Sequence, residues 1–142
     1  MELMVVSLGG DRHRITIGAH ELIVDQPREA GGDDAGPTPT DLFVASLASC
    51  IAHYARRALG SGGGNPTVYC KWEMSDQPPA RVAGISIEIH LPAGTSDARM
   101  AAVRRAVAHC TVHNSLLWPP SLTIRTSLIP APGDTIPAGV SR

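Results

Sequence analysis

A long helix that is apolar on almost every face constrains the fold of this chain most strongly. It is expected to begin at Thr38, which suits the N-cap, with Pro39 in the first helical position and Asp41 completing a capping box. It should run to about Leu59 and end at Gly60. Apolar side chains cover nearly every face of its first half, at Leu42, Phe43, Val44, Leu47, Ala48, Ile51 and Ala52. Such a helix is buried on all sides, so in a chain of 142 residues we expect a second subunit to cover it.

The other segments read as strands and a second helix. We expect strands at 12–17, 20–25, 67–74, 84–91 and 122–128, a helix at about 97–110, and a short helical turn at 112–117. Because the strands are mostly joined in hairpins, the predicted class is α+β with a mostly antiparallel sheet. A single domain is expected at 1–129, followed by a Pro/Gly-rich tail at 130–142.

Composition argues against several classes of function. A net charge of −1 and only 4% aromatic residues argue against a nucleic-acid surface, and the lack of a basic excess argues against an anionic membrane. No apolar run approaches the ~20 residues of a membrane span, and the first residues do not resemble a signal peptide, so a cytoplasmic protein is expected. The glycine runs at 31–32 and 62–64 lack phosphate-loop spacing, and no cofactor is expected.

Two cysteines fall on core-facing positions of the two predicted helices, Cys50 and Cys110. Three cysteines do not suggest a permanent disulfide framework in a reducing compartment. A buried thiol pair is therefore either inert packing or a redox couple. A zinc site is a further alternative, because His53 and His113 each follow one of these cysteines by three residues. Cys70 has no partner motif and is expected to be a structural thiol.

These residues resemble the OsmC/Ohr family, the osmotically inducible protein C and organic hydroperoxide resistance group. The resemblance rests on Gly-Pro-Thr-Pro-Thr-Asp-Leu and Ala-Ser-Leu-Ala-Ser-Cys within 36–50, on Cys-Thr-Val-His at 110–113, and on the hairpin and loop at 18–36. It covers most of the chain from Arg12 to about Leu128. It implies an OsmC-like fold in an intertwined homodimer, with a long buried central helix and the sites at the subunit interface.

The resemblance also implies an activity. Family members reduce organic hydroperoxides, and hydrogen peroxide more weakly, in oxidative-stress defence. Cys50 would be the peroxidatic cysteine and Cys110 the resolving one. The implied partners are a second copy of the chain, the hydroperoxide and a dithiol reductant, for which a lipoylated protein is one candidate. The alternative is a non-enzymatic, small-ligand-binding or stress-associated protein with vestigial cysteines.

The remaining site residues follow from the same resemblance. An arginine on an N-terminal strand activates the thiolate in the family; Arg14 is favoured here over Arg12, because it directly precedes the alternating apolar run. Asp41 is the acid that would hold this arginine. Two positions differ from the family pattern: Thr40 stands where the best-studied members carry Glu, and Thr111 stands where Pro is usual.

Overall fold

The computed structural model describes residues 2–128. In chain order its elements are β1 (Met4–Gly9), β2 (Arg12–Ile17), β3 (His20–Val24), the 3-10 turn η1 (Arg28–Ala30), α1 (Pro39–Leu59), β4 (Thr67–Met74), β5 (Val82–His90), α2 (Asp97–Val107) and α3 (Thr111–Leu117). The strands form two antiparallel sheets, ordered β1-β2-β3 and β4-β5. The predicted α+β class with antiparallel pairing is confirmed. The tail expected at 130–142 lies outside the described residues. None of the described helices is long and apolar enough to cross a membrane.

Local signals at both ends of α1 act as the sequence predicts. The backbone N–H of Asp41 donates to the Thr38 hydroxyl oxygen at 3.1 Å, and the backbone N–H of Thr38 donates to the Asp41 carboxylate at 2.8 Å. Pro39 occupies the first turn, where its missing N–H costs nothing. Gly60 closes the helix with a φ of 71°, a conformation that glycine adopts readily.

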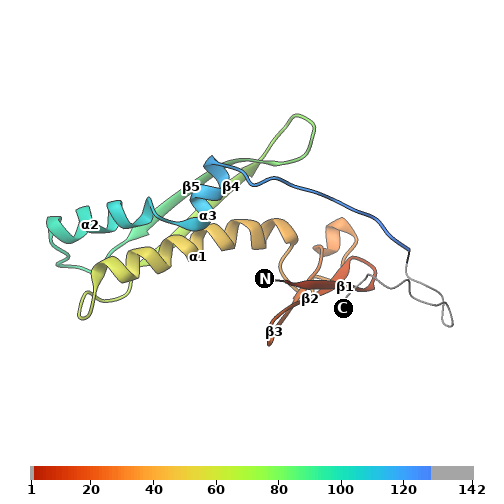
Figure 1. Cartoon of the computed structure of the whole chain (residues 1–142), viewed down its shortest axis with the longest axis horizontal. Coiled ribbons are helices and arrows are strands. Elements are labelled where there is room, and N and C mark those ends of the chain that lie inside the picture. The colour runs from red at the N-terminus through yellow and green to blue at the C-terminus, as the bar shows by residue number, and fades with distance from the viewer. Residues whose placement is uncertain (1, 129–142) are drawn as a thin grey trace, which may run out of the picture.

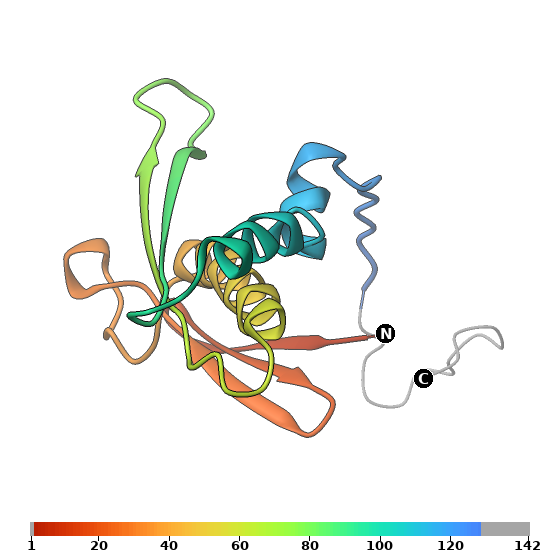
Figure 2. The same ribbon diagram turned by 90° about the vertical axis from the view of Figure 1, so that its left-hand side faces the viewer.

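The core lies between α1, α2 and the β4–β5 hairpin, which α1 and α2 cover side by side (Figures 1 and 2). Leu47 and Ile51 of α1 form one buried cluster with Cys110. Ala55, Leu59 and Val103 form a second cluster between the two helices. Alternation along β5 turns one face inward, so that Ile85, Ile87 and Ile89 pack against these clusters. Burying each large aliphatic side chain stabilises the fold by roughly 1.5–3 kcal/mol.

The three-stranded sheet stands apart from this core (Figure 1). Within residues 2–128, β1–β3 make no extensive contact with the helices or with β4–β5. Apolar side chains before and within β1 and β2 are correspondingly exposed, by 37% to 57%: Leu3, Met4, Val5, Val6, Leu8 and Ile17. Helix α1 likewise buries only one stripe of side chains in the single chain, and Phe43, on another face, is 42% exposed. A single chain therefore leaves part of the predicted buried surface open.

A buried carboxylate organises the loop that connects β3 to α1. Asp25 is 1% exposed, and its carboxylate accepts hydrogen bonds from the backbone N–H groups of Gln26 at 2.8 Å and of Asp33 and Ala35 at 3.1 Å each. The loop packs so closely that a Cβ at Gly32 would collide with the backbone carbonyl of Gln26. The three donated bonds lower the pKa of Asp25, with that from Ala35 the largest single influence, against the opposing effect of burial. Asp25 thereby ties the loop to the end of β3.

Two strand predictions differ from the structure. β1 is not among the predicted strands, because its residues are apolar without the alternation that identifies a half-buried strand. The strand predicted at 122–128 is wrong: this segment has no regular secondary structure, and Leu122, Ile124 and Leu128 are 84%, 80% and 95% exposed. A strand needs a neighbour to satisfy its backbone hydrogen bonds, and residues 122–128 pair with no other strand in the described part of the chain.

The second helix is shorter than predicted. α2 begins after the predicted cap Ser96, whose hydroxyl oxygen accepts the backbone N–H of Arg99 at 3.4 Å, but it ends at Val107 instead of Cys110. Cys110 instead becomes the N-cap of α3. This change places the Cys110 sulfur at the start of a helix.

Candidate functional site

α1 and α3 bring Cys50 and Cys110 together. Cys50 lies in the middle of α1 and is half-buried, whereas Cys110 is fully buried at the N-cap of α3. Both belong to the hydrophobic cluster around Leu47 and Ile51, and both are free thiols. The two side chains lie close enough that each shifts the pKa of the other. The two cysteines are therefore direct neighbours within one chain.

The first turn of α3 directs backbone N–H groups at both sulfurs. The N–H of His113 donates to the Cys110 Sγ at 3.4 Å. The N–H groups of Thr111 and Val112 lie near the Cys50 sulfur and lower the pKa of its thiol. The first N–H groups of a helix have no partner inside the helix, so they are available to acceptors of this kind. They favour a thiolate over a neutral thiol, because the N-terminal end of a helix carries partial positive charge.

The two thiols have opposite pKa shifts. Burial raises the pKa of Cys50, but the hydrogen bonds from the Cys110 thiol and from the Val112 and Thr111 amides together outweigh it, and the pKa of Cys50 is lowered. Burial raises the pKa of Cys110, and the hydrogen bond that it donates to Cys50 raises this pKa further. The proton therefore stays on Cys110, and Cys50 is the sulfur that ionises first.

The two candidate arginines lie on the N-terminal sheet, each beside a carboxylate. Arg14 of β2 forms an ion pair with Glu21 at 3.8 Å, and Arg12 forms one with Asp33 at 3.7 Å. Among the described residues, no arginine contributes to the pKa shift of Cys50. Within one chain, the groups that favour the Cys50 thiolate are the Cys110 thiol and the α3 amides.

Asp41 serves the start of α1. Its carboxylate accepts hydrogen bonds from both the backbone N–H and the hydroxyl of Thr38, each at 2.8 Å. Asp41 and Cys50 are nine positions apart on the same helix, which separates their backbones by about 13 Å at the helical rise per residue. Asp41 therefore does not reach the Cys50 sulfur within a single chain.

The histidines of the zinc alternative do not join the cysteines in a ligand cluster. Among residues 2–128, no group of three or more His, Cys, Asp or Glu side chains is placed to hold a metal ion. The ring of His53 instead stands edge-on to that of Tyr54, with centroids 5.5 Å apart. Cys70 lies on β4, where burial raises its pKa. A raised pKa disfavours a reactive thiolate at this third cysteine.

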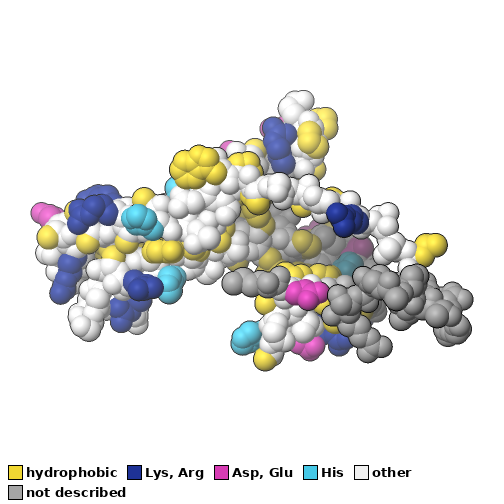
Figure 3. Space-filling view, in the orientation of Figure 1, with side chains coloured by type: hydrophobic (Ala, Val, Ile, Leu, Met, Phe, Trp, Pro, Cys, Tyr) yellow, Lys and Arg dark blue, Asp and Glu magenta, His cyan; other side chains and the backbone are white. Residues whose placement is uncertain are grey.

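A cavity of about 520 Å³, a size typical of small-molecule sites, lies against the cluster that contains Cys110, although neither Cys50 nor Cys110 lines it. Its apolar walls come from α1, β5, α3 and the end of α2, at Leu47, Ile51, Ile85, Ile87, Val107, Ala108 and Leu116. Its polar members are His113 and Arg104, and Lys and Arg side chains gather at the end of the molecule where α2 lies (Figure 3). Neither this cavity nor the position of the α3 amides is predicted from the sequence, because both depend on how separate elements meet.

The chain belongs to the OsmC-like protein family, whose model matches residues 31–125. Its fold is similar to that of an organic hydroperoxide resistance protein OsmC from Legionella pneumophila (TM-score 0.62, 20% identity, covering 82% of this chain and 89% of that one). It is also similar to an OsmC-like protein from Mycoplasma pneumoniae (TM-score 0.68, 15% identity, 82% and 86% covered). A Psychrobacter arcticus protein whose name refers to osmotic stress and detoxification gives a TM-score of 0.70 at 24% identity, with 80% and 85% covered. No curated protein matches the chain.

Proposed function

We propose that this protein is a cysteine-based peroxidase that reduces organic hydroperoxides, and hydrogen peroxide more weakly, in oxidative-stress defence. The observation that carries the proposal is the pair of free thiols in one cluster, in which the pKa of Cys50 is lowered and that of Cys110 is raised. A thiolate is the form of cysteine that attacks peroxides, and a nearby second thiol can trap the product. Membership of the OsmC-like family and the likeness to the Legionella hydroperoxide resistance protein support the same chemistry.

The proposed reaction has two steps on the protein. The Cys50 thiolate attacks the O–O bond, an S–O bond forms as the O–O bond breaks, and the leaving alkoxide takes a proton to become the alcohol. Cys50 is then a sulfenic acid. The Cys110 thiol attacks its sulfur, water leaves, and a Cys50–Cys110 disulfide forms. The two thiols thus supply the two electrons that reduce the peroxide.

Turnover then requires a second reductant. A dithiol, for which a lipoylated protein is one candidate, would reduce the disulfide by thiol–disulfide exchange. We propose the cytoplasm as the setting, because its thiol systems keep such dithiols reduced.

We also propose that the working unit is a homodimer. The open face of α1 and the exposed apolar residues of β1 are the surfaces that a second copy would cover. Arg14 and Asp41 would then act across the interface, since neither approaches Cys50 within one chain. Sedimentation at micromolar concentration should give a dimer, expected to bury more than ~2,000 Å². A folded monomer under these conditions contradicts this part of the proposal.

Mass spectrometry after one equivalent of cumene hydroperoxide tests the activity. We expect a Cys50–Cys110 disulfide in the native chain and a Cys50 sulfenic acid in Cys110→Ser. The matched control is Cys70→Ser, which should behave as the native chain. If Cys50 stays reduced while the protein is folded, the peroxidase proposal fails, and a binding protein with vestigial cysteines becomes the better explanation.

A further inference from the structure

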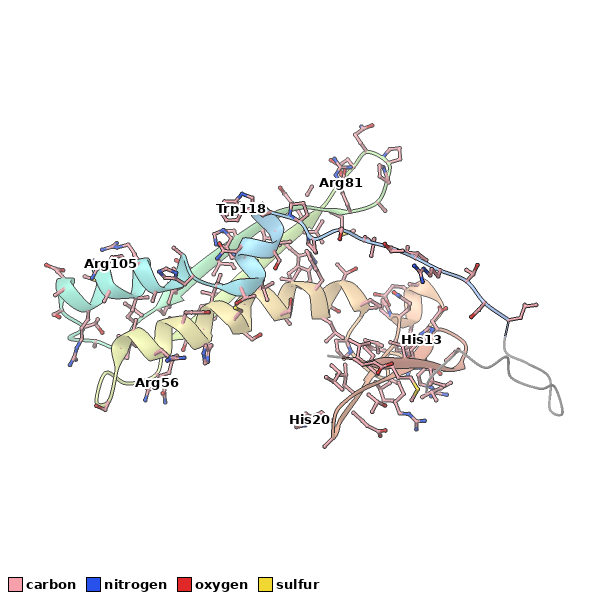
Figure 4. All side chains as sticks on the ribbon, viewed as in Figure 1. His13, His20, Arg56, Arg81, Arg105 and Trp118 are labelled. Carbon is pink, nitrogen blue, oxygen red and sulfur yellow. The ribbon has the colours of Figure 1, made fainter. Side chains whose placement is uncertain are left out.

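Positive charge is concentrated at one end of this molecule. The segments 42–66 and 91–118, which hold most of α1 and all of α2 and α3, contain one acid, Asp97, and five arginines: Arg56, Arg57, Arg99, Arg104 and Arg105. The segment 2–41 has the opposite balance, with eight acidic residues and three arginines. Arg56 of α1 and Arg105 of α2 lie at the same end of the molecule, away from His13 and His20 of the N-terminal sheet (Figure 4). We call the surface that carries the five arginines the basic end.

Stabilisation of the helix ends does not account for all of these arginines. Arg56 and Arg57 lie in the last turn of α1, and Arg104 and Arg105 lie in the last turn of α2, where a cation interacts favourably with the helix dipole. Arg99, however, lies in the first turn of α2, where the same dipole repels a cation. Among residues 2–128, none of the five forms an ion pair with a carboxylate. Their charge is therefore available to an anionic partner.

The basic end lies beside the cysteine pair on both α1 and α2. Cys110 is fully buried and Cys50 is half-buried, so a reductant reaches the Cys50 sulfur first. Arg57 follows Cys50 by seven positions, so it lies on the same side of α1, about 10 Å further along the helix axis. That spacing is comparable to the ~10 Å over which charges interact at 0.1 M salt. On α2, Arg104 lines the same cavity as His113, whose backbone N–H donates to the Cys110 Sγ at 3.4 Å.

We propose that the basic end is the docking surface for an acidic protein that carries the reducing dithiol. The inference rests on the proposed function, because this partner is the reductant of the Cys50–Cys110 disulfide. Five arginines spread over two helices form a larger surface than one small anion can cover, which favours the surface of a protein. Opposite charges on two protein surfaces raise the rate at which they meet, by about tenfold or more at low salt.

The exchange that follows docking balances within the two partners. One thiolate of the carrier attacks the Cys50 Sγ, the S–S bond breaks, and the Cys110 sulfur leaves as a thiolate that takes a proton. The second thiol of the carrier attacks the mixed disulfide, and Cys50 is released as a thiol. The carrier keeps the new disulfide, so two electrons and two protons pass to this protein.

The basic end and the surface assigned to the second copy lie at opposite ends of α1. Phe43, whose exposed face the second copy would cover, lies in the first turns of the helix, whereas Arg56 and Arg57 lie in its last turn. The homodimer and the docked reductant therefore use different parts of the helix.

Reduction of the disulfide by two matched peptides tests the inference. Full-length Cys70→Ser protein is oxidised with diamide, whose N=N bond takes two electrons and two protons from the thiols, and the Cys50–Cys110 disulfide is verified by mass. Each peptide carries one dihydrolipoyl-lysine, which glutamates flank in one peptide and glutamines in the other. Both rates are divided by those with neutral bis(2-hydroxyethyl) disulfide. We expect the acidic peptide to react about tenfold faster at about 0.01 M ionic strength, and to lose this advantage at about 0.5 M.

The triple variant Arg57→Gln/Arg104→Gln/Arg105→Gln should lose most of the preference for the acidic peptide. Arg28→Gln, a change at an exposed arginine of the acidic N-terminal segment, is the matched control and should keep it. Equal rates for the two peptides on the starting protein, or an unchanged preference in the triple variant, overturn the inference and leave the proposed function standing. A triple variant that no longer sediments as a dimer also overturns it, because the arginines then belong to the interface between copies. If diamide yields no Cys50–Cys110 disulfide, both proposals fail.

Discussion

Cys50 and Cys110 lie in the same buried cluster, and the interaction between them shifts their two pKa values apart. Burial alone raises the pKa of both thiols, so two buried cysteines without this contact would both resist ionisation. The interaction gives them different roles, because it stabilises the charged form of Cys50 and the neutral form of Cys110. The same relationship leaves the second thiol in place to attack an oxidised Cys50.

Removing the donor at Cys110 should therefore make Cys50 less reactive. In Cys110→Ala, the pKa of Cys50 should rise, because burial is no longer offset by the thiol hydrogen bond. We expect its alkylation by iodoacetamide at neutral pH to slow by about three- to tenfold, the effect of losing one hydrogen bond. Cys110→Ser keeps a hydroxyl donor and should retain most of the rate. Equal rates in both variants would show that the Cys110 donor does not control the ionisation of Cys50.

The Thr111 amide gives a sharper test, because proline removes an N–H without removing a side-chain contact to sulfur. Thr111 is the first residue of α3, a position where proline fits the helix. Thr111→Pro should raise the pKa of Cys50 and slow its reaction with cumene hydroperoxide, by about three- to tenfold. Thr111→Ser keeps the N–H and serves as the control. A Thr111→Pro protein with the native pH profile of alkylation would exclude the amide as an activating group.

Local signals predict α1 well, and with it the position of Cys50. The cap at Thr38, the proline after it and Gly60 at the far end each act within a few residues, so one sequence is enough to interpret them. The strand predicted around Leu122 and Ile124 is wrong because a strand depends on a partner that is distant in the sequence. Their alternation indicates a side-chain preference, but a strand also needs a neighbour, which the described residues do not provide.

The site is harder to predict than the helices. The sequence identifies both cysteines as core residues, yet the sulfur contacts depend on where α2 stops. A helix continuing to Cys110 would place this residue at a C-terminus, whereas the observed end at Val107 makes it an N-cap. A shift of this size is within the usual uncertainty of helix boundaries, but here it reverses the local electrostatics at the sulfur. The role of the Thr111 amide follows only from that boundary.

The role of Arg14 in the proposed dimer is a separate prediction. If Arg14 acts on Cys50 across the interface, Arg14→Ala should raise the pKa of Cys50 and slow its attack on peroxide, while sedimentation still gives a dimer. Arg12→Ala is the matched control, because Arg12 is also paired with a carboxylate on the N-terminal side of the chain. If the pH profile of Cys50 alkylation is native in both variants, the strand arginines do not activate the thiolate, and the α3 amides and Cys110 remain as the activating groups.

The buried carboxylate of Asp25 predicts a pH-dependent loop. Three backbone N–H groups lower its pKa from the ordinary value of 3.8, against the effect of burial, with Arg12 contributing a smaller attraction. Because the folded pKa lies below the unfolded one, the stabilisation is fully present above the unfolded pKa and is lost as the pH falls through the folded value. Relative to the intrinsic exchange rates at each pH, the protection of residues 26–36 against hydrogen exchange should therefore fall below about pH 4. Asp25→Asn should lower the melting temperature at neutral pH and remove this acid-dependent step.

The control is Asp34→Asn, a change at an exposed acid of the same loop, which should leave both the melting temperature and the acid-dependent step unchanged. An Asp25→Asn protein with native stability and a native acid transition would show that the carboxylate charge does not hold the loop.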